Sequence, residues 1–213
     1  MINRIKSLVK FVLWLVFVLL AKIKIKGSNS VLVWNTRVKN YGKDNVINMG
    51  GHSTYKDCTF LFRGSGNTVI IEEKCSLKGV TFWVEGDGNL LYIGKQTSIE
   101  APCEIAVCEG KEVKIGNDCM FGPNLMIRTS DSHPLFDNFG RRINQAENVY
   151  IGEHVWIGVD VLILKGTIIP DNSVIGARSL LTHSFKSANS VYAGNPCKLI
   201  KSNIIWKRSL NEC

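Results

Sequence analysis

Apolar residues recur at every sixth position over a long stretch of the C-terminal half of the chain. The aliphatic positions of this pattern are Ile151, Ile157, Ile163, Ile169, Ile175 and Leu181. Helices place apolar residues three and four apart, and half-buried strands of an ordinary sheet place them two apart. A period of six instead predicts short strands turned at regular intervals, with the aliphatic side chains stacked inward on every face.

The same template occurs upstream with interruptions. Its anchoring positions are Ile47, Ile71, Ile93 and Ile115, at intervals of 24, 22 and 22 residues. A coil of three six-residue units takes 18 residues, so each early coil carries a few extra residues at one corner. We expect these to form the glycine-rich turns at 63–67 and 85–89.

The interval from Ile115 to Ile151 is 36 residues, which is a doubled coil. It predicts an excursion loop over residues 128–150, and loops that leave a rigid scaffold often carry function. We expect residues 22–45 to begin the stack irregularly. At the other end, residues 198–213 are expected to form a cap that includes a short closing segment or helix.

The first 26 residues differ from the rest of the chain. They contain six basic and no acidic side chains, and residues 11–21 are all uncharged and apolar. A membrane-spanning helix needs about 20 such residues, and no small-residue cleavage site follows. We expect residues 1–26 to be an uncleaved anchor at the cytoplasmic face of the plasma membrane, on or partly in the bilayer, where lysines contact anionic lipid. A helix buried against the domain is the alternative.

Composition places further limits on function. The formal net charge is +8, but without the first 26 residues 20 basic side chains face 18 acidic ones. Residues 27–213, which comprise the domain over residues 27–197 and the C-terminal cap, are therefore nearly neutral, and no nucleic-acid partner is expected. Seven cysteines without a CxxC pair do not predict a disulfide framework or a zinc ribbon. Cys75, Cys103 and Cys119 share one position of the repeat, which predicts small buried core residues in a reducing compartment.

The excursion loop reads Ser130-Asp-Ser-His-Pro-Leu-Phe-Asp137 and is followed by Arg142-Ile-Asn144. Further motifs are His154-Val-Trp-Ile-Gly158, Ile163-Leu-Lys-Gly166, Val174-Ile-Gly-Ala177 and Ala193-Gly-Asn-Pro196. With these motifs, residues 45–206 resemble the hexapeptide-repeat acyltransferases, particularly the sugar O-acetyltransferases of bacterial capsule, exopolysaccharide and O-antigen pathways. The resemblance implies an all-β fold, a left-handed parallel β-helix, that forms a homotrimer. It also implies acetyl-CoA in a cleft between subunits and a saccharide acceptor.

The resemblance places the general base on His133. A sugar hydroxyl is a poor nucleophile and must lose its proton as it attacks a thioester. An imidazole that titrates near neutral pH can take this proton and pass it to the departing thiol. Asp131 or a backbone carbonyl could fix the tautomer of the ring, although an aspartate in a serine-rich turn is as readily a turn residue.

Other site residues follow from the same resemblance. It makes the Trp156 indole N–H, with nearby backbone N–H groups, a candidate donor to the developing oxyanion. The ring face could also hold pantetheine or sugar. Arg142 and Asn144 either anchor the loop or hold the sugar. The expected coenzyme A contacts are Trp156, Gly158, Gly176, Ala177, Thr182 and Lys198, the lysine reaching a phosphate.

Two other functions remain open at this stage. N-acetylation of an amino sugar nucleotide would use the same base and donor, and a membrane-tethered β-helical scaffold would have no activity. A β-helical carbonic anhydrase would need three histidines, two of them close in sequence. The four histidines here include no close pair, so no metal site is expected.

Overall fold

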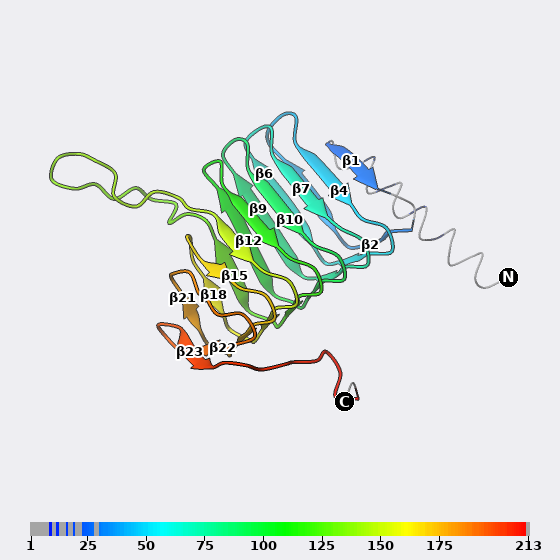
Figure 1. Cartoon of the computed structure of the whole chain (residues 1–213). Coiled ribbons are helices and arrows are strands. Elements are labelled where there is room, and N and C mark those ends of the chain that lie inside the picture. The colour runs from blue at the N-terminus through cyan, green and yellow to red at the C-terminus, as the bar shows by residue number, and fades with distance from the viewer. Residues whose placement is uncertain are drawn as a thin grey trace.

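The protein is described here by a computed structural model that covers residues 9, 12, 16, 19, 23–27 and 30–211. Its short strands form three sheets that run along a single solenoid, and successive coils place one strand in each sheet (Figure 1). The pairing is parallel throughout, apart from the final antiparallel pair. This confirms the predicted all-β parallel solenoid; the left-handed sense of the coil stays a prediction.

The strands of the three sheets follow one another in the order of the coils. The first sheet consists of β1 (Lys24–Gly27), β4 (Val46–Met49), β7 (Thr68–Ile71), β10 (Leu90–Ile93), β13 (Glu112–Ile115), β16 (Val149–Ile151) and β19 (Ile168–Ile169). The second consists of β2 (Leu32–Trp34), β5 (Thr54–Lys56), β8 (Ser76–Lys78), β11 (Ser98–Ile99), β14 (Met120–Phe121), β17 (Trp156–Ile157), β20 (Val174–Ile175), β22 (Val191–Ala193) and β23 (Lys198–Lys201). The third consists of β3 (Arg37–Asn40), β6 (Thr59–Arg63), β9 (Val80–Glu85), β12 (Cys103–Cys108), β15 (Leu125–Arg128), β18 (Leu162–Ile163) and β21 (Leu180–Leu181).

The register of the first sheet corrects one predicted interval. Ile71 pairs with Met49, whereas Ile47 pairs with Val69, so this step is 22 residues rather than 24. Methionine fills the inward position in that coil, and a search for aliphatic residues alone passes over it. Beyond the excursion loop, Ile151 pairs with Ile169, which gives the compact coil of 18 residues.

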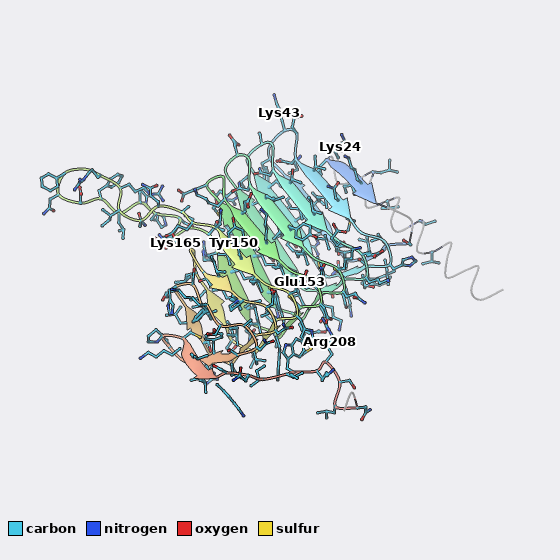
Figure 2. All side chains as sticks on the ribbon, in the orientation of Figure 1. Lys24, Lys43, Tyr150, Glu153, Lys165 and Arg208 are labelled. Carbon is cyan, nitrogen blue, oxygen red and sulfur yellow. The ribbon has the colours of Figure 1, made fainter. Side chains whose placement is uncertain are left out.

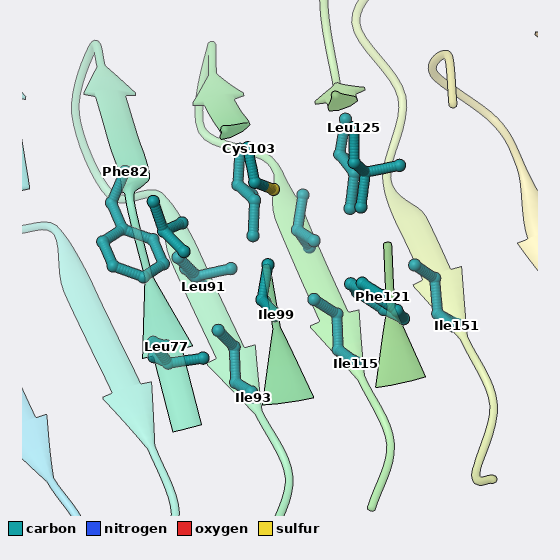
Figure 3. Close-up of a cluster of buried hydrophobic side chains, with 14 of the residues drawn as sticks. Leu77, Phe82, Leu91, Ile93, Ile99, Cys103, Ile115, Phe121, Leu125 and Ile151 are labelled. Carbon is teal, nitrogen blue, oxygen red and sulfur yellow. The ribbon is translucent and has the colours of Figure 1, made fainter. Parts of the chain in front are cut away.

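The core is a continuous column of the inward-facing side chains from all three sheets (Figure 3). Leu77, Ile93 and Ile99 in adjacent strands are fully buried, and the Phe60 and Phe82 rings stack with centroids 4.6 Å apart. The six-residue period therefore reports burial on every face, as predicted.

The extra residues of the early coils occupy the corner between the third and first sheets, where the glycine-rich turns were predicted. A ladder of three buried asparagines supports these turns. The Asn45 Oδ1 atom accepts bonds from the backbone N and the Nδ2 of Asn67, at 2.9 and 3.0 Å. Asn67 Oδ1 accepts the same pair from Asn89, at 2.8 Å each, and Asn89 Oδ1 accepts from the backbone N of Lys111. Each side chain thus satisfies buried backbone and amide donors of the next coil.

The N-terminal end of the stack differs from the sequence-based expectation. The first coil is regular, because β1, β2 and β3 all pair in register with the next coil; the predicted irregular start at 22–45 is wrong. Strand β1 also crosses the predicted boundary between residues 26 and 27. At the other end, β23 closes the second sheet as an antiparallel strand.

The predicted anchor over residues 1–26 falls mostly outside the described residues and stays a prediction. Of its described helical positions, Val9, Val12, Val16 and Leu19 are all about half exposed or more. Among the residues that the structure describes, no helix has the length and apolar character needed to cross a membrane.

The cysteines predicted as core residues are buried. Burial raises the pKa of the Cys75 thiol to about 11 and those of Cys103 and Cys119 to about 12. These thiols therefore remain protonated at neutral pH and pack as small apolar side chains.

Candidate active site

The excursion loop spans residues 129–148, between β15 and β16, and leaves from the corner that the asparagine ladder supports. It projects away from the stack as a narrow finger (Figure 1). A bridge between Phe136 and Arg142 joins its two limbs. The side chain of Asp137 closes the tip by accepting bonds from the backbone N of Phe139 and of Arg141, both at 2.9 Å. The loop is therefore an ordered hairpin-like element.

A charged cluster anchors one limb of the finger to the coil beneath it. The Arg142 guanidinium donates two bonds to the Glu109 carboxylate, at 2.6 and 3.0 Å, and the Ser130 hydroxyl donates to the same carboxylate. These bonds, those from Arg142 above all, lower the pKa of Glu109 to about 2. Of the two roles left open for Arg142, its contacts therefore support loop anchoring.

A second cluster fixes the segment that carries His133. The buried Asn144 amide donates to Asp131 Oδ2 and to the backbone O of His133, each at 2.8 Å, and its Oδ1 accepts from the backbone N of Leu135 at 2.7 Å. The Lys165 ammonium also donates to Asp131 Oδ2, and this bond is the main reason that the pKa of Asp131 is lowered. Lys165 lies near the base of the finger (Figure 2).

These contacts bear on the predicted roles of Asp131 and Asn144. Asp131 bonds to Lys165 and Asn144, and no bond joins its carboxylate to the His133 ring in the described part of the chain. Asn144 holds the His133 backbone in place. These contacts do not support the alternative in which Asn144 binds the sugar, because its amide group already forms hydrogen bonds within the loop.

The His133 side chain is exposed and lines a groove of about 550 Å³ between the loop and the outer face of the third sheet. The groove is lined by Arg63, Trp83, Glu85, Gly86, Cys108, Glu109, Arg128, Ser130, Ser132, His133, Pro134 and Arg142. No bond to either ring nitrogen of His133 occurs within residues 30–211. A backbone held by Asn144 and an exposed ring with unbonded nitrogens suit a general base.

Trp156 lies elsewhere on the molecule. It is on β17 in the second sheet, is 41% exposed, and does not line the His133 groove. Gly158, Gly176 and Ala177 follow strands of that sheet. A Cβ atom at Gly158 would lie 2.9 Å from the backbone N of Ala177, so glycine is needed there for the coils to stack.

Two further predicted coenzyme A contacts lie near this end of the solenoid. Thr182 directly follows β21, and Lys198 opens β23; both are exposed. Within one chain, the structure therefore places the predicted contacts on the second sheet, Trp156 among them, on a different face from His133. Thr182 instead follows a strand of the third sheet.

Sequence reasoning predicted a C-terminal cap but missed that part of it packs beside Trp156. The Trp206 ring stacks on His154, with centroids 4.0 Å apart, and its indole N–H donates to the His154 backbone O at 2.8 Å. The ring also lies 6.0 Å from that of Trp156. Arg208 then pairs with Asp118. We call residues 202–211 the C-terminal strap; no local signal in the sequence predicts a contact across 52 residues.

Glu109 and Lys165 were missed for a related reason. Each is a corner residue of a coil that is adjacent to the loop in space, but they lie 33 and 34 residues from Arg142 and Asp131. Once the 36-residue doubled coil is recognised, both positions can be placed at the corner where the loop leaves.

Comparison with known proteins identifies the family. A polysialic acid O-acetyltransferase of Neisseria meningitidis is 34% identical over 190 residues, which cover 79% of this chain and 88% of the relative. A polysialic acid O-acetyltransferase of Escherichia coli O1:K1 is 38% identical over 117 residues, and the match spans only 38% of that relative. No family model matches the sequence.

Solved structures agree with these relatives. The crystal structure of the polysialic acid O-acetyltransferase OatWY has a TM-score of 0.85, 33% identity and 89% coverage of both chains. The polySia-specific acetyltransferase NeuO has a TM-score of 0.64, 31% identity and coverage of 83% of this chain and 84% of its own. Together with the solenoid and the His133 loop, these similarities show that the chain belongs to the hexapeptide-repeat O-acetyltransferases.

Proposed function

We propose that the protein transfers an acetyl group from acetyl-CoA to a hydroxyl of a sugar or polysaccharide, with His133 as the general base. The observation that carries this proposal is the groove in which the unbonded His133 ring faces solvent on a fixed backbone. Relatives that act on polysialic acid support a saccharide acceptor.

The groups of this chain have complementary tasks. Acetyl-CoA supplies the activated thioester. His133 takes the proton from the acceptor hydroxyl as its oxygen bonds to the acetyl carbon, and returns this proton to the thiol as the carbon–sulfur bond breaks. The Trp156 indole N–H is the proposed donor to the carbonyl oxygen as negative charge develops there. Gly158 and Gly176 have no side chains, so they leave space beside the coil for coenzyme A. Lys198 is the proposed partner of a coenzyme A phosphate.

We propose that the working unit is a homotrimer whose active sites lie between subunits. Because His133 and Trp156 lie on different faces of one chain, a second copy is needed to bring the two side chains together. The tip of the finger supports this proposal: Leu135, Phe136 and Phe139 are 58, 59 and 83% exposed. Such a cluster of exposed apolar side chains is typical of a protein contact.

We also propose that the protein works at the cytoplasmic face of the plasma membrane, attached through residues 1–26. The first coil adds support, because Lys24 and Lys43 lie at the N-terminal end of the stack (Figure 2). Lys26 and Lys39 are on the edge strands of the same coil. None of these lysines makes an ion pair with another described residue, so all are available to anionic lipid.

An acceptor panel tests the proposed reaction. The wild-type protein is incubated with acetyl-CoA and either an oligosialic acid, a neutral oligosaccharide or an amino sugar nucleotide, and products are identified by mass spectrometry. Alkaline hydrolysis then separates esters, which are cleaved, from amides, which persist. We expect an ester on a saccharide. An amide product would favour N-acetylation, and no product with any acceptor would contradict the proposal.

A mixing experiment tests the shared site. His133→Ala and Trp156→Ala chains are each expected to be nearly inactive, and co-refolding them is expected to restore part of the activity, since some interfaces then carry both native residues. No recovery in trimers that contain both chains would contradict a site built from two subunits.

A further inference from the structure

Beside His133, the side chains on the outer face of the third sheet differ in size from one coil to the next. The register aligns Leu61, Trp83, Ala106 and Arg128 in one outward row. The neighbouring row contains Arg63, Glu85 and Cys108. In the coil above Trp83 and Glu85, these rows hold the small side chains of Ala106 and Cys108, both buried.

The groove lies over Cys108 and is bordered by Trp83 and Arg128. Neighbouring strands lie about 4.8 Å apart, so Trp83 and Arg128 are separated by two strand spacings, or about 10 Å, with small residues between them. Trp83 and Cys108 both line the groove, together with His133. The groove has space for a sugar ring next to the one that carries the reacting hydroxyl.

Trp83 is held in a fixed orientation within this groove. Its indole N–H donates to Glu85 Oε2 at 2.8 Å, and the Arg63 guanidinium lies 5.1 Å from the ring centroid. A restrained aromatic ring loses little conformational entropy on binding and offers apolar surface to the C–H groups of a pyranose.

Among the arginines of the groove, Arg63 differs in its partners. Arg142 is engaged by Glu109, and Arg128 donates to Ser132 at 3.0 Å and lies 3.6 Å from Glu104. Arg63 is exposed and makes no ion pair with another described residue. It is therefore the guanidinium of this groove that is available for an added carboxylate.

We propose that Trp83 and Arg63 form an acceptor subsite for an acidic glycan, one sugar unit away from the ring that is acetylated. The indole packs against the apolar face of this neighbouring sugar, and Arg63 binds its carboxylate. The subsite rests on the proposed saccharide acetylation and predicts that acidic oligosaccharides are better acceptors than the corresponding monosaccharide.

Steady-state kinetics with a sialic acid tetramer, the sialic acid monomer and maltotetraose test this subsite. For Trp83→Ala we expect the KM for the tetramer to rise about tenfold, which equals about 1.4 kcal/mol. The KM for acetyl-CoA and the kcat at saturating tetramer should stay within about twofold of wild type, because His133 and its supports are unchanged. Trp83→Phe should recover most of the loss. Trp34→Ala, which removes an exposed tryptophan from the second sheet, should leave all constants unchanged.

Arg63→Gln tests the charge assignment separately. We expect it to raise the KM for the sialic acid tetramer at least fivefold and to leave any KM for maltotetraose unchanged. Equal effects on both acceptors would overturn the role of Arg63, and an unchanged KM for the tetramer in Trp83→Ala would overturn the subsite. If the wild type acetylates none of the three probes, the proposed function itself fails, so the two failures are distinguishable.

Discussion

The early coils and the excursion loop solve the same structural problem differently. Both hold extra residues at the corner between the third and first sheets. The early coils use buried, neutral asparagines that repeat every 22 residues. The loop is held instead by partly exposed ionic contacts, Glu109 with Arg142 and Asp131 with Lys165. Buried amide ladders give rigidity to the stack, whereas charged contacts position a projecting element while keeping its functional side chain in solvent.

The largest effect on stability is expected from breaking the ladder at its centre. Asn67→Ala leaves the buried backbone N of Asn89 without its acceptor. Asn89 Nδ2 still donates to the backbone O atoms of Glu85 and Gly86, and Asn45 Oδ1 still accepts from the backbone N of residue 67. An unsatisfied buried polar group costs about 1–3 kcal/mol, so we expect the free energy of unfolding to fall by about 2 kcal/mol. Chemical denaturation at fixed protein concentration measures this loss.

The matched control for the ladder lies on the finger. Asn138→Ala changes the same residue type at an exposed position and should alter the free energy of unfolding by less than about 0.5 kcal/mol. Equal losses at Asn67 and Asn138 would contradict the contrast between the two regions.

A smaller effect is expected at the C-terminal strap. Arg208 pairs with Asp118 and donates to Ser98 Oγ and to the backbone O atoms of Gln96 and Cys119. Arg208→Ala should destabilise the strap by about 1–2 kcal/mol and speed trypsin cleavage after Lys201. Lys207→Ala, at a neighbouring exposed position, is the control, and equal cleavage rates in the two variants would show that Arg208 does not hold the strap.

The smallest effect is expected from the anchor of the finger, and it depends on pH. The pKa of Glu109 is about 2 in the folded protein, below its usual 4.5. Its stabilisation is therefore complete above about pH 4.5 and is lost as the pH falls toward 2. Because this carboxylate is about one-third exposed, we expect Glu109→Gln to lower the free energy of unfolding by only about 0.5 kcal/mol at pH 7.

The pH dependence supplies its own control. The difference in the free energy of unfolding between wild type and Glu109→Gln should shrink when the pH is lowered from 7 to 3. A constant difference for Glu109 would indicate that its charge does not hold the loop.

The sequence predicted the features set by local repeats better than the contacts between residues that are distant in the chain. The period of six identified the stack and its 36-residue interruption, because the same position of each six-residue unit faces the core and is occupied by an aliphatic residue. Met49 was not recognised as part of the pattern, because the search was for branched aliphatic residues and methionine is apolar but unbranched. The ladder was readable in principle, because Asn45, Asn67 and Asn89 are spaced by one coil.

The partners within the site were harder to predict. The resemblance selected His133, but the bonds of Glu109 to Arg142 and of Lys165 to Asp131 depend on which corners meet after a doubled coil. Trp206 reaches His154 only because the strap returns along the second sheet. The groove at Trp83 depends on the sizes of residues in three successive coils, which become neighbours only when the register is known.

The proposed acetyl transfer depends on the imidazole of His133 as its general base. Release of the coenzyme A thiol from acetyl-CoA in the presence of an oligosialic acid should be measured for His133→Asn and for His52→Asn, an exposed histidine on another corner. We predict that His133→Asn lowers kcat by about 10²–10⁴-fold, with an unchanged melting temperature, and that His52→Asn matches the wild type. A His133→Asn enzyme that retains wild-type kcat would contradict the role of His133 as the general base.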